Sequence, residues 1–243
     1  YRNLGNGRFE EVTDASGLAS NLGSTSAAFA DIDGDGDLDL YVAAYKVESA
    51  ADVLRPYENA SVELVVDGPD GPSIAEPFRE HFRIESRGGV DVAVEQADPD
   101  RLYLNDGAGV FEPVPWDGGR FLQSNGQPLT RDLDDFGLAV GFHDVDGDGD
   151  PDLYVCNDFD DPDQLWLNDG TGFFRAADLL ALRTTSHASM AVDFSDIDRD
   201  GHVDFFVADM LSADPAKRLA QVPLHASIEK PIGRWSDRLQ VGR

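Results

Sequence analysis

A nine-residue loop rich in aspartate occurs three times in this chain, and it limits the possible folds more than any other feature. The copies are Asp31-Ile-Asp-Gly-Asp-Gly-Asp-Leu-Asp39, Asp144-Val-Asp-Gly-Asp-Gly-Asp-Pro-Asp152 and Asp196-Ile-Asp-Arg-Asp-Gly-His-Val-Asp204. Each copy lies between an apolar stretch and a short run of β-branched, aromatic and other apolar residues. Such runs are typical of buried strands and are too short for helices. Each loop is therefore expected to join two strands of a repeated unit.

A second element repeats together with the loops. It is a turn rich in Asn, Asp and Gly that begins at Asn3, Asn105 and Asn168. These residue types tolerate the positive φ angles that tight hairpins need. The sequence therefore predicts a unit of strand, Asp loop, strand, connection, strand, Asn-Gly turn and strand. Four strands per unit are typical of a propeller blade, so the predicted fold is an all-β propeller of four-stranded blades.

The spacing of the loops predicts the boundaries of the units. The second and third loops begin 52 residues apart, which is close to known blade lengths, whereas the first and second begin 113 apart. The predicted division is 1–23 as the end of one blade, 24–115 as a blade with an insertion at about 45–100, 116–183 as a blade, and 184–243 as an incomplete blade with a long excursion.

The insertion has two interpretations at this stage. Extra strands are expected within it at Phe82–Ile84 and Val90–Val94, and a degenerate blade without the Asp loop is the alternative. The chain opens at Tyr1 rather than at methionine. Since closed propellers contain about four to eight blades, we expect a partial propeller from a parent with seven or eight.

Spacing within the loops predicts a metal site in each. Carboxylates at positions one, three and five of a tight loop point to a common centre, and glycine at position six allows the sharp turn. Position seven offers its carbonyl, and position nine closes the shell. Calcium prefers such a flexible shell of oxygens. The predicted ligands are Asp31, Asp33, Asp35, Asp37, Asp39, Asp144, Asp146, Asp148, Asp150, Asp152, Asp196, Asp198, Asp200, His202 and Asp204.

The same Asp-rich pattern has two alternative interpretations. An EF-hand also has ligands at positions one, three and five, but it needs a glutamate at position twelve and flanking helices. Position twelve here is Val42, Val155 or Val207, each within an expected strand. The other alternative is a solvated Asp-rich turn without an ion, which three copies in register make less favoured.

Composition excludes several classes of partner and site. The formal net charge of −28 disfavours binding to nucleic acid or to anionic membranes. Cys156 is the only cysteine, so a disulfide within the chain or a Cys-based zinc site is impossible. No run of 18 apolar residues is present, so no transmembrane segment is predicted.

Two other clusters of polar residues are interpreted as structural or solvated rather than functional. His187 lies near Ser186 and Ser189, but no nucleophile elbow accompanies them, so no catalytic residue is assigned and a non-enzymatic role is favoured. Asp158, Asp160, Asp161 and Asp163 are expected to form a solvated connection, with a second cation site as the alternative.

The loops resemble the FG-GAP/VCBS repeats of integrin-like propellers. The segments Cys156-Asn-Asp-Phe159, Pro162–Asn168, Ser189–Asp193 and Asp209-Met-Leu211 further resemble the cartilage acidic protein (ASPIC/UnbV) group. His202 departs from the pattern at position seven, where Asp is commoner, and the group's usual C-terminal region is absent.

This resemblance implies structural calcium and a secreted or cell-surface protein. It also implies adhesion or binding to an extracellular protein or glycan. A secreted hydrolase or lyase that uses the propeller channel or a calcium site is the rival hypothesis.

Overall fold

Among the described residues, the named regular elements are β-strands, apart from the short 3-10 helix η2 (Trp116–Gly118). The structure is a computed structural model that describes residues 1–48, 64–69, 71–76, 78–87, 90–158, 161–178, 180–212, 214, 216–217 and 239–240. The predicted all-β class is therefore confirmed. Most of the excursion predicted within 184–243 lies outside the described residues. In the part of the chain that is described, no helix combines the length and the hydropathy that a membrane span requires.

The predicted order of strands, loop and turn is present twice. The first sheet has the order β10-β9-β4-β3 and contains β3 (Ser24–Ala30), β4 (Asp39–Ala44), β9 (Arg101–Asn105) and β10 (Phe111–Pro113). The second has the order β11-β15-β14-β13-β12 and contains β11 (Phe121–Leu122), β12 (Gly137–His143), β13 (Asp152–Asn157), β14 (Gln164–Asn168) and β15 (Phe174–Ala176). All neighbours in the two sheets are antiparallel, except that β11 is parallel to β15.

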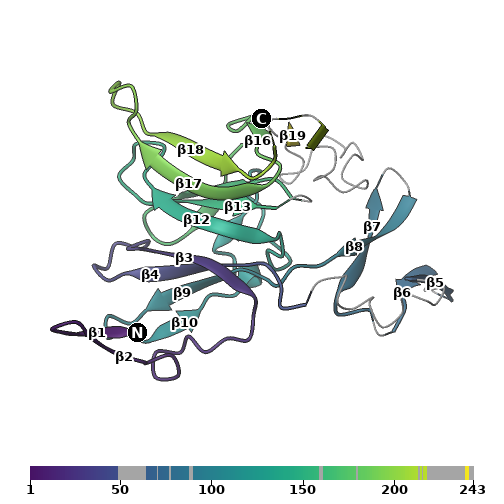
Figure 1. Cartoon of the computed structure of the whole chain (residues 1–243), viewed down its shortest axis with the longest axis horizontal. Coiled ribbons are helices and arrows are strands. Elements are labelled where there is room, and N and C mark those ends of the chain that lie inside the picture. Colours follow the sequence, from purple (N-terminus) through teal and green to yellow (C-terminus); the bar gives the residue numbers. More distant parts are fainter. Residues whose placement is uncertain are drawn as a thin grey trace.

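The remaining strands form two-stranded sheets. The third Asp loop joins β17 (Ser189–Ser195) to β18 (Asp204–Asp209). Two further pairs are β1 (Arg2–Gly5) with β2 (Arg8–Glu10), and β16 (Thr184–Thr185) with β19 (Leu239–Gln240). The remaining two-stranded sheets belong to the insertion. The sheets of the described residues do not close into a ring (Figure 1).

Strand register is the same around all three Asp loops. The residue before each loop pairs with the last residue of the loop, as in Ala30 with Asp39, His143 with Asp152 and Ser195 with Asp204. Each pair of strands also has an irregularity at the same distance before the loop, between Ser24 and Ser26 in the first copy. Because a slip of one residue would turn every side chain to the opposite face, this shared register gives equivalent side chains of the three loops the same orientation on their own strands.

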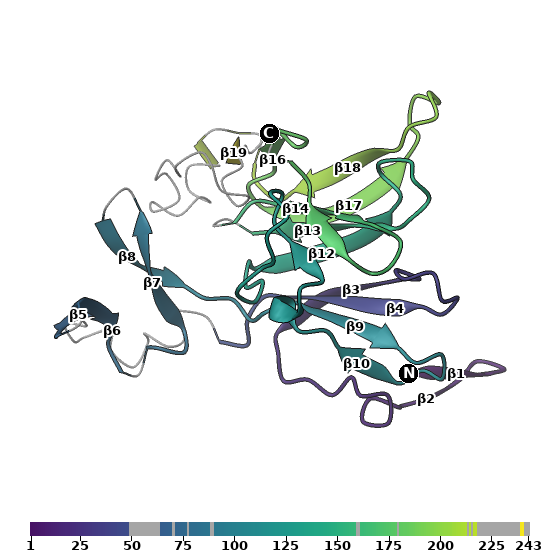
Figure 2. The ribbon, with the colours of Figure 1, turned by 180° about the vertical axis from the view of Figure 1, so that it is seen from behind.

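The three sheets pack in layers, with their Asp loops at one end (Figures 1 and 2). One core lies between the first and second sheets and includes Tyr41, Trp116, Phe121, Trp166 and Phe174. A second core joins the second sheet to β17 and β18. Every unit therefore buries apolar side chains against its neighbour, as repeat proteins do.

The insertion forms an arm at the opposite end from the Asp loops (Figures 1 and 2). It holds the hairpins β5 (Val65–Gly68) with β6 (Gly71–Ile74), and β7 (Phe82–Arg87) with β8 (Val90–Glu95). The two extra strands predicted from sequence are therefore confirmed as β7 and β8. The arm has a small core of its own around Ile74, Phe78 and Phe82, and the ion pair Arg83–Asp134 links it to the second unit.

In the first and second sheets, a buried carboxylate joins the second and third strands at the end away from the Asp loops. Asp100 accepts hydrogen bonds from the Tyr41 hydroxyl (2.7 Å) and the Ala44 amide (2.7 Å). Asp163 does the same with the Tyr154 hydroxyl (2.8 Å) and the Asn157 amide (2.9 Å). The two carboxylates thus occupy equivalent positions in successive units.

The prediction of a solvated connection is consequently wrong for Asp163 and Asp158, which are both buried. Asp163 is buried because it is the acceptor for these strand donors, and the Tyr45 hydroxyl donates to Asp158. Asp161 is partly buried, and Asp160 lies outside the described residues.

Burial of Asp100 predicts a pH-dependent stability. Burial raises the pKa of Asp100 from 3.8 to about 7, and the hydrogen bonds from Ala44 and Tyr41 offset only part of this effect. Between these two values the folded protein binds a proton that the unfolded chain releases, so stability falls as pH rises through this range. For one group the slope is at most about 1.4 kcal/mol per pH unit.

We therefore expect Asp100→Asn, which cannot titrate, to make the free energy of unfolding less dependent on pH between about 4 and 7. Urea denaturation of the wild type and the variant in chelating buffer measures both slopes. Equal slopes would contradict the assignment.

Candidate metal centre

Three carboxylates converge in each Asp loop. One oxygen from each of positions one, three and nine lies within 4.8 Å of the other two. The groups are Asp31, Asp33 and Asp39, then Asp144, Asp146 and Asp152, then Asp196, Asp198 and Asp204. Since Ca²⁺ binds oxygen at about 2.3–2.6 Å, two oxygens on one ion lie at most about 5 Å apart. The spacing of the three carboxylates therefore fits one calcium ion per loop.

Oxygens without partners support the same fit in the first loop. Asp31 Oδ1, Asp33 Oδ1 and Asp37 Oδ1 are shielded from solvent and accept no hydrogen bond from the described residues. A buried acceptor without a partner is costly, and native structures rarely contain several together. A cation bound by the converging carboxylates of Asp31 and Asp33 would provide a partner for such oxygens.

The backbone of the loop is held in the same way in all three copies. Position one accepts the amide of position six, at 3.1 Å from Gly36, 3.0 Å from Gly149 and 3.1 Å from Gly201. These glycines have φ of 93°, 101° and 90°, a left-handed conformation that few other residues adopt. The side chains at position one are thus oriented by the loop itself.

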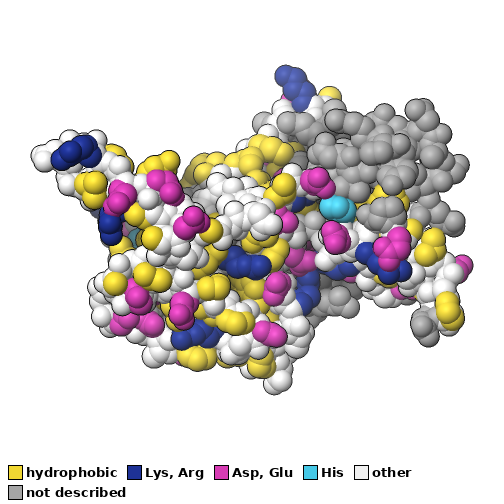
Figure 3. All heavy atoms as spheres, turned by 90° about the horizontal axis from the view of Figure 1, so that it is seen from below, with side chains coloured by type: hydrophobic (Ala, Val, Ile, Leu, Met, Phe, Trp, Pro, Cys, Tyr) yellow, Lys and Arg dark blue, Asp and Glu magenta, His cyan; other side chains and the backbone are white. Residues whose placement is uncertain are grey.

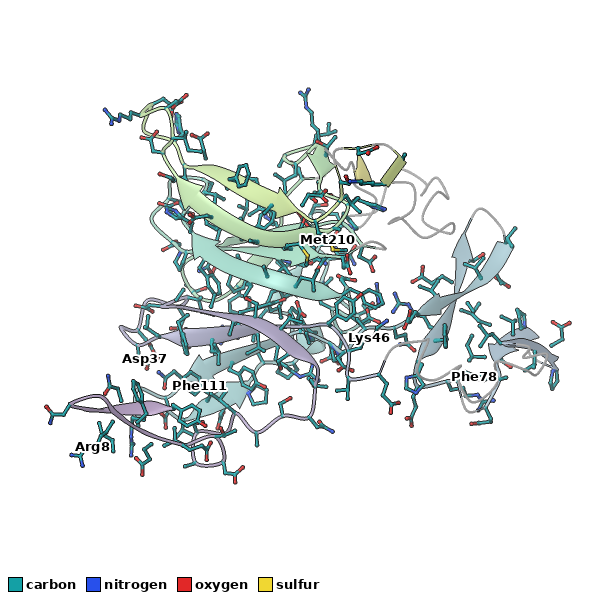
Figure 4. The ribbon with its side chains drawn as sticks, in the orientation of Figure 1. Arg8, Asp37, Lys46, Phe78, Phe111 and Met210 are labelled. Carbon is teal, nitrogen blue, oxygen red and sulfur yellow. The ribbon has the colours of Figure 1, made fainter. Side chains whose placement is uncertain are left out.

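Positions five and seven have other contacts in the structure. The carboxylate at position five accepts the amide of position seven in every loop, at 3.0, 3.0 and 2.8 Å. The side chain at position seven lies over the Asn-Gly turn of its own unit, because Asp37 Oδ2 is 3.1 Å from the place of a β-carbon on Gly107. Figure 4 shows Asp37 at the loop end of the first sheet. His202, the third residue at position seven, is exposed.

Position nine has a second role that the sequence did not indicate. Asp39 accepts the amide of Ile32 with Oδ2 at 3.2 Å and that of Asn105 with Oδ1 at 2.9 Å. Asp152 does the same with Val145 at 2.9 Å and Asn168 at 2.8 Å. Each of these carboxylates therefore ties its Asp loop to the end of the third strand. The repeated Asn105 and Asn168 at the ends of the third strands could have indicated this contact. The insertion hides the correspondence, because position nine and the Asn are 66 residues apart in the first unit and 16 in the second.

Burial and neighbouring carboxylates disfavour the charged form of several side chains in the loops. Burial raises the pKa of Asp152 to about 6, and Asp146 and Asp148 add repulsion. The pKa of Asp37 is also raised, mainly by burial and then by Asp35. Figure 3 shows acidic side chains spread over the visible face, at the loop end and elsewhere. A divalent cation would relieve both the burial and the repulsion of these carboxylates.

The serines near His187 have their protons engaged elsewhere. Ser186 donates its hydroxyl to Asp209 at 2.7 Å, and Ser189 donates to Asp163 at 2.6 Å. A serine hydroxyl has one proton, and a catalytic triad requires it to be donated to histidine. This geometry gives no support to nucleophilic catalysis here.

The two roles of position nine predict different effects of substitution in metal-free protein. Asp152→Ala leaves the amides of Val145 and Asn168 without acceptors, so we expect it to lower the free energy of unfolding by about 2–4 kcal/mol. Asp146→Asn keeps an acceptor at an exposed position, so we expect a change below about 0.5 kcal/mol. Chemical denaturation in chelating buffer measures both changes. Similar losses in the two variants would contradict the structural role of Asp152.

The comparisons with known proteins agree with this geometry. The family described as FG-GAP-like repeat matches residues 1–42 and 144–207, which include the whole of each Asp loop. A search of curated proteins gave no match. Over these two segments the chain is therefore similar to FG-GAP-like repeats.

Proposed function

We propose that the chain is a calcium-binding repeat module of a β-propeller that acts in extracellular binding or adhesion. The convergence of positions one, three and nine in three loops of the same register is the observation that carries this proposal. Calcium is structural in it: the ion neutralises the loop between the first two strands of each unit, and the first and second loops are already tied to the third strand.

Calcium is favoured over other ions by the chemistry of the donors. The converging atoms are all carboxylate oxygens, which hard cations prefer, whereas transition metals favour nitrogen or sulfur. Magnesium requires near-ideal octahedral geometry at about 2.0–2.1 Å and retains several waters. A loop that supplies several carboxylates at looser spacing suits the larger ion.

A propeller is supported by the arrangement of the units. Two four-stranded antiparallel meanders and the β17–β18 pair pack in layers, with all Asp loops at one end. We therefore retain as part of the proposal the division into 1–23, 24–115, 116–183 and 184–243. Closure of the ring would use further units of the same kind, within the range of known propellers.

An extracellular role is supported by the family and by the metal. FG-GAP repeats are typical of extracellular proteins, and calcium sites of extracellular modules work at about 10⁻⁴–10⁻³ M. The proposed partner is an extracellular protein or glycan. Immobilised extracellular-matrix proteins and glycans test this class of partner. Binding that disappears on chelation supports it, and equal binding with and without calcium opposes it.

Calcium binding is tested by calorimetric titration of chelated protein, with the melting temperature followed in parallel. We expect three sites, one for each converging group. Each site should add about 2.7 kcal/mol of stability when free calcium is 100 times its Kd. Magnesium at the same concentration should have a smaller effect.

Single substitutions at position three assign the sites. Asp33→Asn, Asp146→Asn and Asp198→Asn should each reduce the stoichiometry by one ion, because each removes one carboxylate of a converging group. Asp14→Asn removes an exposed carboxylate outside the loops and is the matched control. The proposal fails if calcium produces neither heat nor stabilisation.

A further inference from the structure

Asn168 contacts two different Asp loops. It is buried at the end of β14, and its side-chain amide donates to the Ile32 carbonyl of the first loop at 2.8 Å. The same Nδ2 lies 3.3 Å from the Pro151 carbonyl of the second loop. Its backbone amide donates to Asp152 at 2.8 Å, and Asp152 is position nine of that second loop. One residue thus connects the two candidate calcium sites.

The contact with the first loop crosses from one repeat unit to the next. Ile32 belongs to the first unit, and its amide donates to Asp39, which is position nine of the first loop. Asn168 therefore holds the carbonyl of the peptide unit that follows Ile32, between positions two and three. Since Asp33 is position three, this bond fixes the backbone next to a predicted ligand.

Other atoms of the same turn also lie against the first loop. A β-carbon on Gly172 would lie 3.3 Å from Asp33 Cβ and 2.7 Å from Arg120 Nη1. A β-carbon on Gly34 would lie 3.7 Å from the Gly170 carbonyl oxygen. The turn 168–172 of the second unit therefore forms one wall of the first metal loop.

The residue at position two of each loop is buried to the extent that the neighbouring unit covers that loop. Ile32 is fully buried in the first loop, and Val145 is partly buried against the core that includes β17 and β18. Ile197, the equivalent residue of the third loop, is 65% exposed in the described part of the chain. The next unit therefore covers the first loop most and the second loop less.

Asn105 provides an internal comparison. It occupies the same place in the first unit, where its backbone amide donates to Asp39 at 2.9 Å and its side chain donates to the Leu38 carbonyl at 3.1 Å. These are contacts with the loop of its own unit, equivalent to those of Asn168 with Asp152 and Pro151. The bond to Ile32 is the additional contact of Asn168.

We propose that Asn168 is a positioning residue that completes the first calcium site from the second repeat unit and couples the first and second sites. The proposal rests on the calcium-binding function proposed above. Calcium at the second loop fixes Asp152, to which Asn168 is bonded, and Asn168 fixes the first loop. Such coupling is reciprocal, so each ion raises the affinity of the other site by the same factor.

The test isolates each site by substitution. Asp146→Asn with Asp198→Asn leaves the first site, and Asp33→Asn with Asp198→Asn leaves the second. In the first background, Asn168→Ala should raise the calcium Kd by roughly 3- to 10-fold, because it removes a buried hydrogen bond to the loop. In the second background, Asn105→Ala should leave the Kd within about twofold, since Asn105 contacts the first loop alone.

A second variant and a second readout separate positioning from loss of fold. Asn168→Ser retains a hydroxyl near the Gly170 amide but is too short to reach Ile32, so it should weaken the first site in the same way. The melting temperature in chelating buffer should fall for both Asn168→Ala and Asn105→Ala, and further for Asn168→Ala, which also loses the buried bond to Ile32. A cooperative melting transition in chelating buffer shows that the variant is folded, so a change in first-site affinity then reports positioning of the loop.

The outcomes distinguish the two proposals. Calcium binding at the first site with the same Kd in wild-type and Asn168→Ala backgrounds would overturn the role of Asn168 and leave calcium binding intact. Absence of calcium binding in every background would overturn the proposed function itself. With Asn168 present, Asp146→Asn should raise the calcium Kd of the first site. In protein that carries Asn168→Ala, Asp146→Asn should no longer change this Kd.

Discussion

In the first two units, the buried carboxylate at position nine is the interaction on which the rest of the unit depends. It is the last residue of the Asp loop and the first of the second strand, and it accepts the amides of both the loop and the third strand. Asp163 makes a corresponding set of bonds at the other end of the same strands. In these two units the central strands are therefore fixed at both ends by a carboxyl group that is removed from solvent, which is stable only because hydrogen-bond donors surround it.

Much of the fold could be predicted from the sequence, because the loops and turns repeat and apolar runs flank them. The strands around all three loops, the Asn-Gly turns and the strands β7 and β8 were predicted. The hairpin of β5 and β6 was not, since its sequence has little apolar alternation. The buried positions of Asp158 and Asp163 were also missed, because the donors Tyr45 and Ser189 are 113 and 26 residues away in the chain.

The convergence of positions one, three and nine could be predicted from the sequence, whereas the differences between the three loops could not. Spacing identifies carboxylates that converge, and the structure brings positions one, three and nine together in all three loops. Spacing does not reveal which neighbouring unit covers each loop, because that depends on packing between units. The contact of Asn168 with Ile32 joins residues that are 136 positions apart, so local sequence patterns do not encode it. Three nearly identical motifs consequently have three different surroundings.

The position of the inserted arm has a consequence for how this architecture can diversify. The arm leaves the first unit after β4 and returns before β9, at the end of the sheet away from the Asp loops. It carries its own small apolar core, so its sequence can change with little effect on the strands that hold the metal loops. Evolution can therefore lengthen or replace the arm to acquire a new surface while the repeat scaffold is retained.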